Sequence, residues 1–481
     1  MTLFLWALRK PNGRKSSVNK ALSDTDCSAA VDGFLYLLYN RDIYMYGGIG
    51  MTKLFSLILS FLALFTSLFV PFETASVPDS QDDFVPVARF IATSDTHIST
   101  LGDKGCKRVA KMLNTAYAIA EADEDYNGLD AVVFSGDITD SGTFTAFSAF
   151  TATTNKAIKG DTERLAVVAK AHDGYTYSNG SLDIYTSLTG QETDFHRVIN
   201  GFHYIGVSRS DSGEHYLPEQ VQWLDNELKK ATEDAPLQPV FVFTHEHVLN
   251  TVFGSYTYDG WGLDTFLEVL NKYPQAVHIS GHSHYPANDP RSIWQGNFTA
   301  IGDGGLAYYE FTVDDKTAVH PENYKTMTQA LLIEIDALNR VLVRVLDVDA
   351  GKYVKEYLID NVASPVKVKY NHEARKRLST APVFSDGAEL TVKKSAAQYE
   401  VTVPQAKVFG DNEVYLYRIS IKNSSGREVY SDRELSQYYF AEVPESITFN
   451  GIYLGTDSYT VTVVAEDVWG NVSTPLTTVI G

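Results

Sequence analysis

Residues 87–97 read VARFIATSDTH, a short apolar run that ends in Asp95-Thr96-His97. A run of this length, rich in Val, Ile, Phe and Ala and ending in polar residues, is typical of a strand buried on both faces. The carboxylate and imidazole that follow it then lie on a loop at the carboxyl end of the strand, where open α/β sheets place their functional sites. This stretch predicts an α/β fold with a polar site at the edge of its sheet.

Similar apolar runs recur downstream, at residues 131–135, 165–169, 240–244 and 276–280. Polar clusters follow them in the order Gly136-Asp137, His172-Asp173, His245 and Gly281-His282-Ser283-His284. Helical spacing of apolar residues predicts a helix over 109–121. A second helix is expected over 145–159, although its threonines lower the helix propensity. Strands alternating with helices indicate an α/β layout.

Carboxylate and imidazole side chains dominate these clusters. The candidate metal ligands are Asp95, His97, Asp137, His245, His282 and His284. Imidazole with carboxylate suits zinc, iron or manganese, and the set is larger than one four-coordinate ion needs. Two ions about 3.5–4 Å apart can hold the attacking and leaving oxygens of an in-line displacement at phosphorus. The clusters therefore predict metal-dependent phosphoester hydrolysis.

The ordered set resembles the calcineurin-like metallophosphoesterases, whose pattern runs D-x-H, G-D-x-x-D, G-N-H-D, H and G-H-x-H. The matching segments, within residues 84–362, are Asp95-Thr96-His97, Gly136-Asp137-Ile138-Thr139-Asp140, Lys170-Ala171-His172-Asp173, His245 and Gly281-His282-Ser283-His284. The resemblance implies a layered α/β/β/α metallophosphatase sandwich. It also implies an enzyme that hydrolyses phosphate mono- or diesters, nucleotides among them, by metal-activated hydroxide.

The resemblance implies a role for each matched residue. Asp95, His97 and His284 would hold one divalent ion (Mn, Fe or Zn), His245 and His282 would hold the second, and Asp137 would bridge the two. His172 would protonate the leaving oxygen or stabilise the developing charge. Asp173 would orient the ring of His172.

Two positions depart from the family pattern, and one differs from a subgroup of it. Ala171 replaces the Asn whose carboxamide oxygen binds the second metal, and a methyl group cannot coordinate. Either a water or another side chain replaces this ligand, or the second ion binds weakly, or the site is catalytically dead. The last outcome would make the chain a non-catalytic or metal-depleted surface binding protein on a metallophosphatase fold. Lys170 replaces the family Gly and brings a cation toward the phosphate site. Asp140 stands where purple acid phosphatases carry a metal-binding Tyr, which argues against an iron–tyrosinate centre.

Each residue also has an ordinary structural explanation. Asp95 or Asp137 alone could cap a helix, and His172 or His245 alone could be a loop or surface histidine. Taken as one ordered set they favour a metal site. Asp140 has two possible roles, support of the metal site or capping of the next helix, and capping is favoured.

Two loops are candidates for shaping a substrate pocket. Residues 252–263 carry the aromatic residues Phe253, Tyr256, Tyr258 and Trp261. These rings either stack on a base, sugar or aryl group or pack the loop onto the domain, and packing is favoured. Arg291 in the segment 286–296 is a candidate phosphate contact, with solvated surface as the alternative.

The amino-terminal region predicts export. Lys53 precedes an apolar run at 54–70, and small residues follow at 74–76, so residues 51–76 are expected to be a signal peptide. An uncleaved membrane anchor is the alternative, because about 17 apolar residues are near the lower limit for a span. Residues 1–50 are expected to be a non-native extension before a start at Met51. The mature protein is expected to be secreted or at the surface of a bacterial cell, without stable membrane insertion.

The net charge limits the expected binding partners, and the cysteine count limits the expected disulfides. A formal net charge of −20 opposes binding to duplex nucleic acid or anionic membranes, whereas a small phosphate ester fits a site with bound cations. If Cys27 is lost with the leader, Cys106 is the remaining thiol and no intrachain disulfide can form.

The carboxyl-terminal part is expected to be all-β. Residues 331–336 and 341–347 predict a hairpin around Asn339, 355–359 continue the strand pattern, and 363–394 are expected to be a linker. Period-two alternation in 395–481 predicts a β-sandwich. Its last strands resemble a fibronectin type III or immunoglobulin-like module, which implies a spacer, or a cell-surface or carbohydrate contact. Trp469 is expected to pack near a turn.

Overall fold

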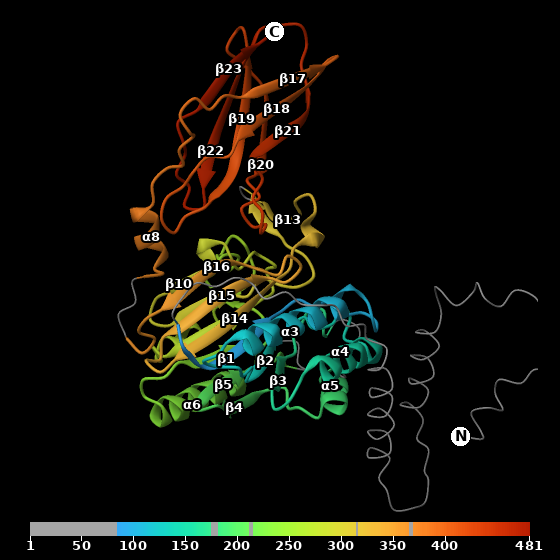
Figure 1. Cartoon of the computed structure of the whole chain (residues 1–481), viewed down its shortest axis with the longest axis vertical. Helices are drawn as coiled ribbons and strands as arrows, with labels where there is room; N and C mark the ends of the chain where they lie inside the picture. The colour runs from blue at the N-terminus through green and yellow to red at the C-terminus, as the bar shows by residue number, and fades with distance from the viewer. Residues whose placement is uncertain (1–83, 175–180, 211–214, 314–315, 365–368) are drawn as a thin grey trace, which may run out of the picture. The chain divides into compact units, whose positions relative to one another are not determined.

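The computed structural model describes residues 84–174, 181–210, 215–313, 316–364 and 369–481 (Figure 1). These residues belong to one unit of the chain, Gly50–Gly481. The expected extension, the signal peptide and Cys27 lie outside the described residues. Among the described helices, none combines the length and apolar character that a membrane span requires.

Two six-stranded sheets form the first domain (Figure 1). The first has the order β16-β15-β14-β1-β2-β3, with β1 Pro86–Thr93, β2 Ala131–Ser135, β3 Glu163–Val167, β14 Gln329–Asp336, β15 Val341–Asp347 and β16 Lys352–Ile359. The second has the order β10-β11-β9-β6-β5-β4, with β4 Phe195–Ile199, β5 Phe202–Gly206, β6 Val240–Phe243, β9 Ala276–Ser280, β10 Ile293–Gln295 and β11 Thr299–Gly302.

Strand β1 shows how the layers are built, because its side chains alternate between two cores. Phe90 packs between the sheets with residues of the second sheet such as Phe241, whereas Ile91 packs against the helices of the first. Those helices are α3 Lys104–Ala122, α4 Phe144–Ala157 and α5 Ser181–Thr189. Helices α6 Pro218–Asp234 and α7 Leu267–Leu270 share a core with the outer face of the second sheet. The predicted α/β/β/α layering is confirmed.

The parallel strands bring the predicted clusters to the sheet edges. β1, β2 and β3 run parallel in the first sheet, and β6 and β9 run parallel in the second. β2 and β9 have the predicted bounds, whereas β3 begins and ends two residues before the predicted 165–169. The loops after these strands therefore start from neighbouring points.

Helix α4 forms despite its threonines. The hydroxyls of Thr151, Thr153 and Thr154 donate hydrogen bonds to the carbonyl oxygens of the residues four positions earlier. Buried hydroxyls therefore have partners inside the helix, and α4 can pack its apolar residues in the core. Thr143 caps α4, and Asp103 caps α3.

Short elements connect the larger ones. They are β7 His247–Val248 with β8 Gly262–Leu263, the 3₁₀ turn η1 Pro290–Ser292, the hairpin β12 Phe311–Val313 with β13 Lys316–Val319, and the 3₁₀ turn η2 Tyr324–Thr326. The predicted hairpin of β14 and β15 is confirmed, and Asn339 takes a left-handed φ of 60° in its turn.

An all-β domain follows. Antiparallel sheets of order β17-β18-β21 and β20-β19-β22-β23 enclose a common core (Figure 1). The strands are β17 Thr391–Ser395, β18 Gln398–Pro404, β19 Val414–Asn423, β20 Glu428–Leu435, β21 Ser446–Tyr453, β22 Tyr459–Asp467 and β23 Leu476–Ile480. The core includes Phe384, before the predicted boundary at residue 395.

The segment expected to be a linker contains a helix, α8 His372–Leu378. Its Arg375 is buried, contacts the carboxylate of Asp411 and lies 5.1 Å from the ring of Trp469. Trp469 is itself 7% exposed, as expected for a residue packed near a turn. Tertiary contacts therefore order a basic segment whose composition alone resembles a linker.

Candidate metal centre

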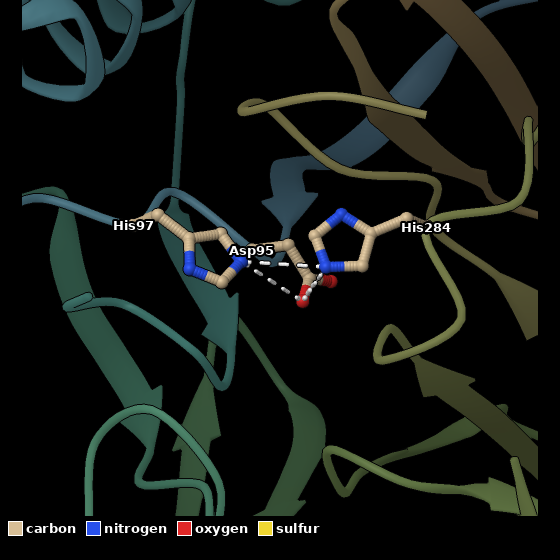
Figure 2. A group of neighbouring side chains, drawn as sticks. All are labelled: Asp95, His97 and His284. Carbon is tan, nitrogen blue, oxygen red and sulfur yellow. Dashed lines mark hydrogen bonds and ion pairs between the residues drawn. The ribbon is translucent and has the colours of Figure 1, made fainter. Parts of the chain in front are cut away.

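The loops after β1 and β9 bring Asp95, His97 and His284 together (Figure 2). The Oδ1 atom of Asp95 lies 3.2 Å from Nε2 of His284 and 3.8 Å from Nε2 of His97. The two Nε2 atoms are 3.3 Å apart. One carboxylate oxygen and two ring nitrogens thus converge on a common point, as ligands of one cation do.

A second group comes from the loops after β2, β6 and β9 and contains Asp137, His245 and His282. Nε2 of His245 lies 3.3 Å from Oδ2 of Asp137 and 3.1 Å from Nδ1 of His282. Asp137 also groups with His97 and His172, so its carboxylate reaches both sides of the site. The structure brings together every candidate metal ligand.

Hydrogen bonds on the far side of two rings fix which nitrogen can bind a cation. Nδ1 of His284 lies 3.2 Å from the carbonyl oxygen of Tyr308, and Nδ1 of His245 lies 2.9 Å from that of Ser135. A carbonyl accepts hydrogen bonds, so Nδ1 donates to it and Nε2 is the ring nitrogen turned toward the site, which can bind a cation once it has given up any proton of its own. Oδ1 of Asp95 is buried without a hydrogen-bond partner. A divalent cation would satisfy these atoms, and the residues therefore fit a metal.

The backbone is strained where the ligands are attached. Asp95, His97, Asp137, His282 and His284 have φ angles of 51°, 44°, 45°, 71° and 54°. Residues other than Gly in this region cost about 1–3 kcal/mol each, and they cluster at functional sites. The fold therefore holds these side chains in place against a local preference for other conformations.

Two glycines of the motif allow the loops to approach each other. A Cβ on Gly281 would lie 2.6 Å from Oδ2 of Asp95, and a Cβ on Gly136 would lie 2.5 Å from Nδ1 of His245. Both distances are shorter than any Cβ contact tolerates, so a side chain at either position would push a ligand away. The motif's glycines are thus part of the site.

Comparison with known proteins agrees with this geometry. Residues 88–286 match the family model of the calcineurin-like phosphoesterases. This part of the chain is a calcineurin-like phosphoesterase domain. No curated protein matches the chain.

Two solved structures are among those that match parts of the chain. The purple acid phosphatase from yellow lupin (Lupinus luteus) seeds is 14% identical, and the match covers 59% of this chain and 57% of that one with a TM-score of 0.39. The chain therefore spans little more than half of the lupin protein's length. The phosphopantetheinyl hydrolase of Mycobacterium tuberculosis is 13% identical, with 46% and 90% covered and a TM-score of 0.27.

His172 of the phosphoesterase domain lies at the mouth of the site with its side chain 39% exposed. Its ring meets that of His97 edge to face, with centroids 4.3 Å apart. Its Nδ1 lies 3.1 Å from the carbonyl oxygen of Asp140, and its backbone N–H donates to Oδ1 of Asp137 at 3.2 Å. The ring is therefore held close to the ligands by two backbone contacts.

The structure gives Asp173 a different role from the predicted one. Its buried carboxylate accepts hydrogen bonds from the backbone N–H groups of Ala169 and Thr139 and from the Thr139 hydroxyl. The ring of His172 has a different partner, because its Nδ1 faces the carbonyl oxygen of Asp140. Asp173 therefore braces the loop after β3 against the loop after β2. Burial raises the pKa of Asp173 to about 6.

Asp140 does not cap a helix, because Thr143 caps α4. Its Oδ1 lies 3.6 Å from Nδ1 of His97 and 3.8 Å from Nδ1 of His172. The imidazole of His97 holds the pKa of Asp140 below its usual range. Of the two roles weighed for Asp140, the structure favours support of the site.

The carboxylates of the site respond differently to burial. Burial raises the pKa of Asp95, with the neighbouring Asp137 acting in the same direction. Burial also acts to raise the pKa of Asp137, but the charge of His245 and its hydrogen bond act more strongly in the other direction. The pKa of Asp137 therefore lies well below its usual range. Asp137 is thus ionised, as a metal ligand must be, and a cation would favour the same state of Asp95.

Sequence reasoning missed a carboxyl group beneath the ligands. Asp303 is fully buried directly after β11, with Oδ1 2.6 Å from the hydroxyl of Ser94, which also contacts Oδ2 of Asp95. Its Oδ2 contacts the hydroxyl of Ser135, and burial raises its pKa to about 7. The sequence did carry a signal for Asp303, because this carboxylate directly follows the short strand-like segment 299–302, as Asp95 follows a strand.

Arg291, the candidate phosphate contact, has its partners inside the fold. Its guanidinium is paired with Asp289 at 2.7 Å and lies 3.7 Å from the ring centroid of Phe253 and 4.5 Å from that of Tyr415. These contacts enclose the cation in the core that joins the two domains. Nearby, Phe253 is buried, which confirms packing for this ring of the 252–263 loop.

The other aromatic rings of the 252–263 loop have different surroundings. The hydroxyl of Tyr256 lies 3.1 Å from Nδ1 of His372, whereas the side chain of Tyr258 is 68% exposed. Trp261 meets the ring of His282 edge to face at 5.1 Å. The loop therefore packs mainly on the protein, and Trp261 is the ring of this loop that touches a predicted metal ligand.

Proposed function

We propose that the chain is a secreted, metal-dependent phosphoesterase that hydrolyses small phosphate mono- or diesters. The observation that carries this proposal is the position of Asp137, which groups with His97 on one side and with His245 and His282 on the other. A carboxylate between two sets of ligands supports a dinuclear centre of the kind that acts on phosphorus. Asp95, His97 and His284 would hold one ion, and His245 and His282 the other.

Divalent ions bound there would supply Lewis acidity and lower the pKa of a bound water to about 7. The chain's own residues would orient the ester and handle the proton. Because Nδ1 of His172 faces the carbonyl oxygen of Asp140, its Nε2 is the atom that would deliver a proton to the leaving oxygen. His172 is half-exposed, so a substrate can reach this atom.

The proposal is tested by metal content and hydrolysis measured on the same preparation. The purified protein is assayed with p-nitrophenyl phosphate and bis(p-nitrophenyl) phosphate, after EDTA treatment and after addition of Mn²⁺, Zn²⁺ or Fe²⁺. Activity that disappears with EDTA and returns with one of the ions supports the proposal, and the faster ester distinguishes a monoesterase from a diesterase. Two bound ions with no hydrolysis of either ester would overturn it.

Ala171 favours a second candidate function, a metal-depleted protein that binds a ligand on this fold without hydrolysing it. The loop that carries Ala171 touches the site, since the next residue donates its backbone N–H to Asp137. The second group thus has Asp137, His245 and His282 but no carboxamide from position 171. A protein that retains less than one ion and binds inorganic phosphate without turnover would support this alternative.

Export and the role of the last domain complete the proposal. Residues 51–76 would direct secretion, and N-terminal sequencing of protein from the culture medium would show whether cleavage follows the small residues at 74–76. The strand order β17-β18-β21 and β20-β19-β22-β23 supports a fibronectin type III or immunoglobulin-like module. Such a module would serve as a spacer or contact a cell surface or carbohydrate.

A further inference from the structure

A cavity of about 480 Å³ opens beside the first group of ligands. Two imidazoles of the site, His97 and His172, form part of its lining. Three further rings line it, those of Tyr308, His320 and Tyr324. Because the predicted proton donor faces this cavity, a leaving group attached to the phosphorus would enter it. The volume is in the range of cavities that hold small ligands.

The three additional rings form one connected wall. Tyr308 stacks on the metal-ligand candidate His284 with centroids 4.0 Å apart and meets Tyr324 edge to face at 5.9 Å. His320 in turn stacks on Tyr324 at 4.3 Å. All three come from the connection between β11 and β14, which includes the β12–β13 hairpin and η2. One segment therefore supplies the wall that faces the site.

Charged residues also line the cavity, but they have partners within the fold. Nζ of Lys104 donates to the carbonyl oxygen of Lys325 at 2.5 Å, and Nζ of Lys325 lies 5.3 Å from the ring centroid of Tyr324. Arg108 is paired with Asp349 at 2.9 Å. Asp103 and Asp140 add negative charge to the same lining. The rings, and not an excess of one charge, distinguish this cavity.

We propose that the cavity receives a planar aromatic group of the substrate, so that the preferred substrates are phosphate esters of nucleosides or aryl alcohols. This inference rests on the proposed function. Aromatic rings and imidazoles provide faces and edges against which a nucleobase stacks, whereas a sugar without a base would leave most of the wall uncovered. The selecting wall is Tyr308, His320 and Tyr324 and not the aromatic loop 252–263.

The test compares two esters with the same leaving oxygen. Adenosine 5′-monophosphate and ribose 5-phosphate are both cleaved at a primary alkoxide and differ in the base. We expect kcat/KM of the wild-type protein to be at least about tenfold higher for the nucleotide, the range in which single-base stacking contributes. Tyr324→Ala should remove most of this preference, because kcat/KM for the nucleotide falls far more than kcat/KM for ribose 5-phosphate.

Two matched variants separate the ring from other effects. Tyr324→Phe keeps the ring and should keep the preference. Tyr258→Ala removes an exposed ring of the other loop and should leave both rates unchanged. Equal rates of the wild-type protein on both esters, or an equal loss on both in Tyr324→Ala, would overturn the inference.

A binding measurement makes the inference independent of turnover. Calorimetry with adenosine and with ribose should show binding of adenosine alone, weakened about five- to twentyfold by Tyr324→Ala. If no phosphate ester is hydrolysed but adenosine binds in this way, the proposed function fails and the aromatic site stands. If phosphate esters are hydrolysed but adenosine does not bind selectively, the aromatic site fails and the proposed function stands.

Discussion

Replacing Ala171 with Asn should restore a ligand to the second metal position. Ala171 is half-buried on the loop after β3, and the backbone N–H of the next residue lies 3.2 Å from Oδ1 of Asp137. A carboxamide at this position therefore starts from the edge of the group formed by Asp137, His245 and His282. Its oxygen would add a donor to three existing ones.

The expected size of the effect follows from the number of donors. Loss of a partner that merely supports a ligand weakens metal binding about 10–100-fold, so gain of a direct oxygen donor should strengthen it by at least that factor. This corresponds to about 1.4–2.7 kcal/mol of binding free energy. The first group, Asp95, His97 and His284, is untouched by the substitution and should keep its affinity.

The assay is a calorimetric titration of chelator-treated protein with Mn²⁺ or Zn²⁺. Wild-type protein should show one tight and one weak event, and Ala171→Asn should tighten the weak event alone. Ala171→Leu is the matched control, because leucine has nearly the shape of asparagine without the oxygen. Hydrolysis of p-nitrophenyl phosphate at limiting metal should rise with the second affinity.

Two results would refute the reasoning. Two tight events in the wild-type protein that Ala171→Asn leaves unchanged would mean that another donor already completes the second position. An equal gain in Ala171→Leu and Ala171→Asn would mean that packing of the loop, and not a new ligand, alters the affinity.

Three further predictions concern residues around the ligands. His172→Ala should lower kcat about 10²–10⁴-fold with bound metal per chain unchanged, as shown by kinetics and elemental analysis, and a proportional loss of metal would contradict the role of proton donor. Asp173→Ala should lower the free energy of unfolding by about 2–4 kcal/mol in urea titrations, because buried donors at Ala169 and Thr139 lose their acceptor, and an unchanged midpoint would argue against the brace. For Asp303 the pKa is about 7 in the fold and about 3.9 in the unfolded chain, so folding takes up a proton and this carboxyl lowers stability as the pH rises from about 4 to about 7. Between pH 5 and pH 8 the metal-free wild-type protein should therefore lose roughly 2–3 kcal/mol more stability than Asp303→Asn, and parallel pH profiles would show that Asp303 is ionised in the fold.

Local sequence accounts for the strands and for the identity of the ligands. The bounds of β2 and β9 follow from short apolar runs, because a strand buried on both faces contains little else. The ligands were recognisable because metal chemistry admits few residue types and because each cluster directly follows a strand. The glycines at 136 and 281 belong to the same local signal, since the close approach they permit is required at fixed positions beside the ligands.

The surroundings of Asp303 and Arg291 depend on contacts between segments that are distant in the sequence. Ser135 and Asp303 are 168 residues apart in the sequence, yet their side chains touch beneath the site. An arginine is usually found at the protein surface. The guanidinium of Arg291 is enclosed instead, by the rings of Phe253 and of Tyr415 from the second domain. No periodicity in either segment indicates these neighbours.

The sequence by itself determined which strands are buried, which side chains can bind a metal and in what order they occur. Those properties depend on hydrophobic periodicity and on donor chemistry, and both act over a few residues. The tertiary structure decided that Asp173 braces a loop, that Asp303 supports Asp95 through Ser94, and that Tyr308, His320 and Tyr324 line one cavity with His172. These outcomes depend on how whole sheets and loops pack, because the direction and partners of a side chain are fixed when the segments around it come together.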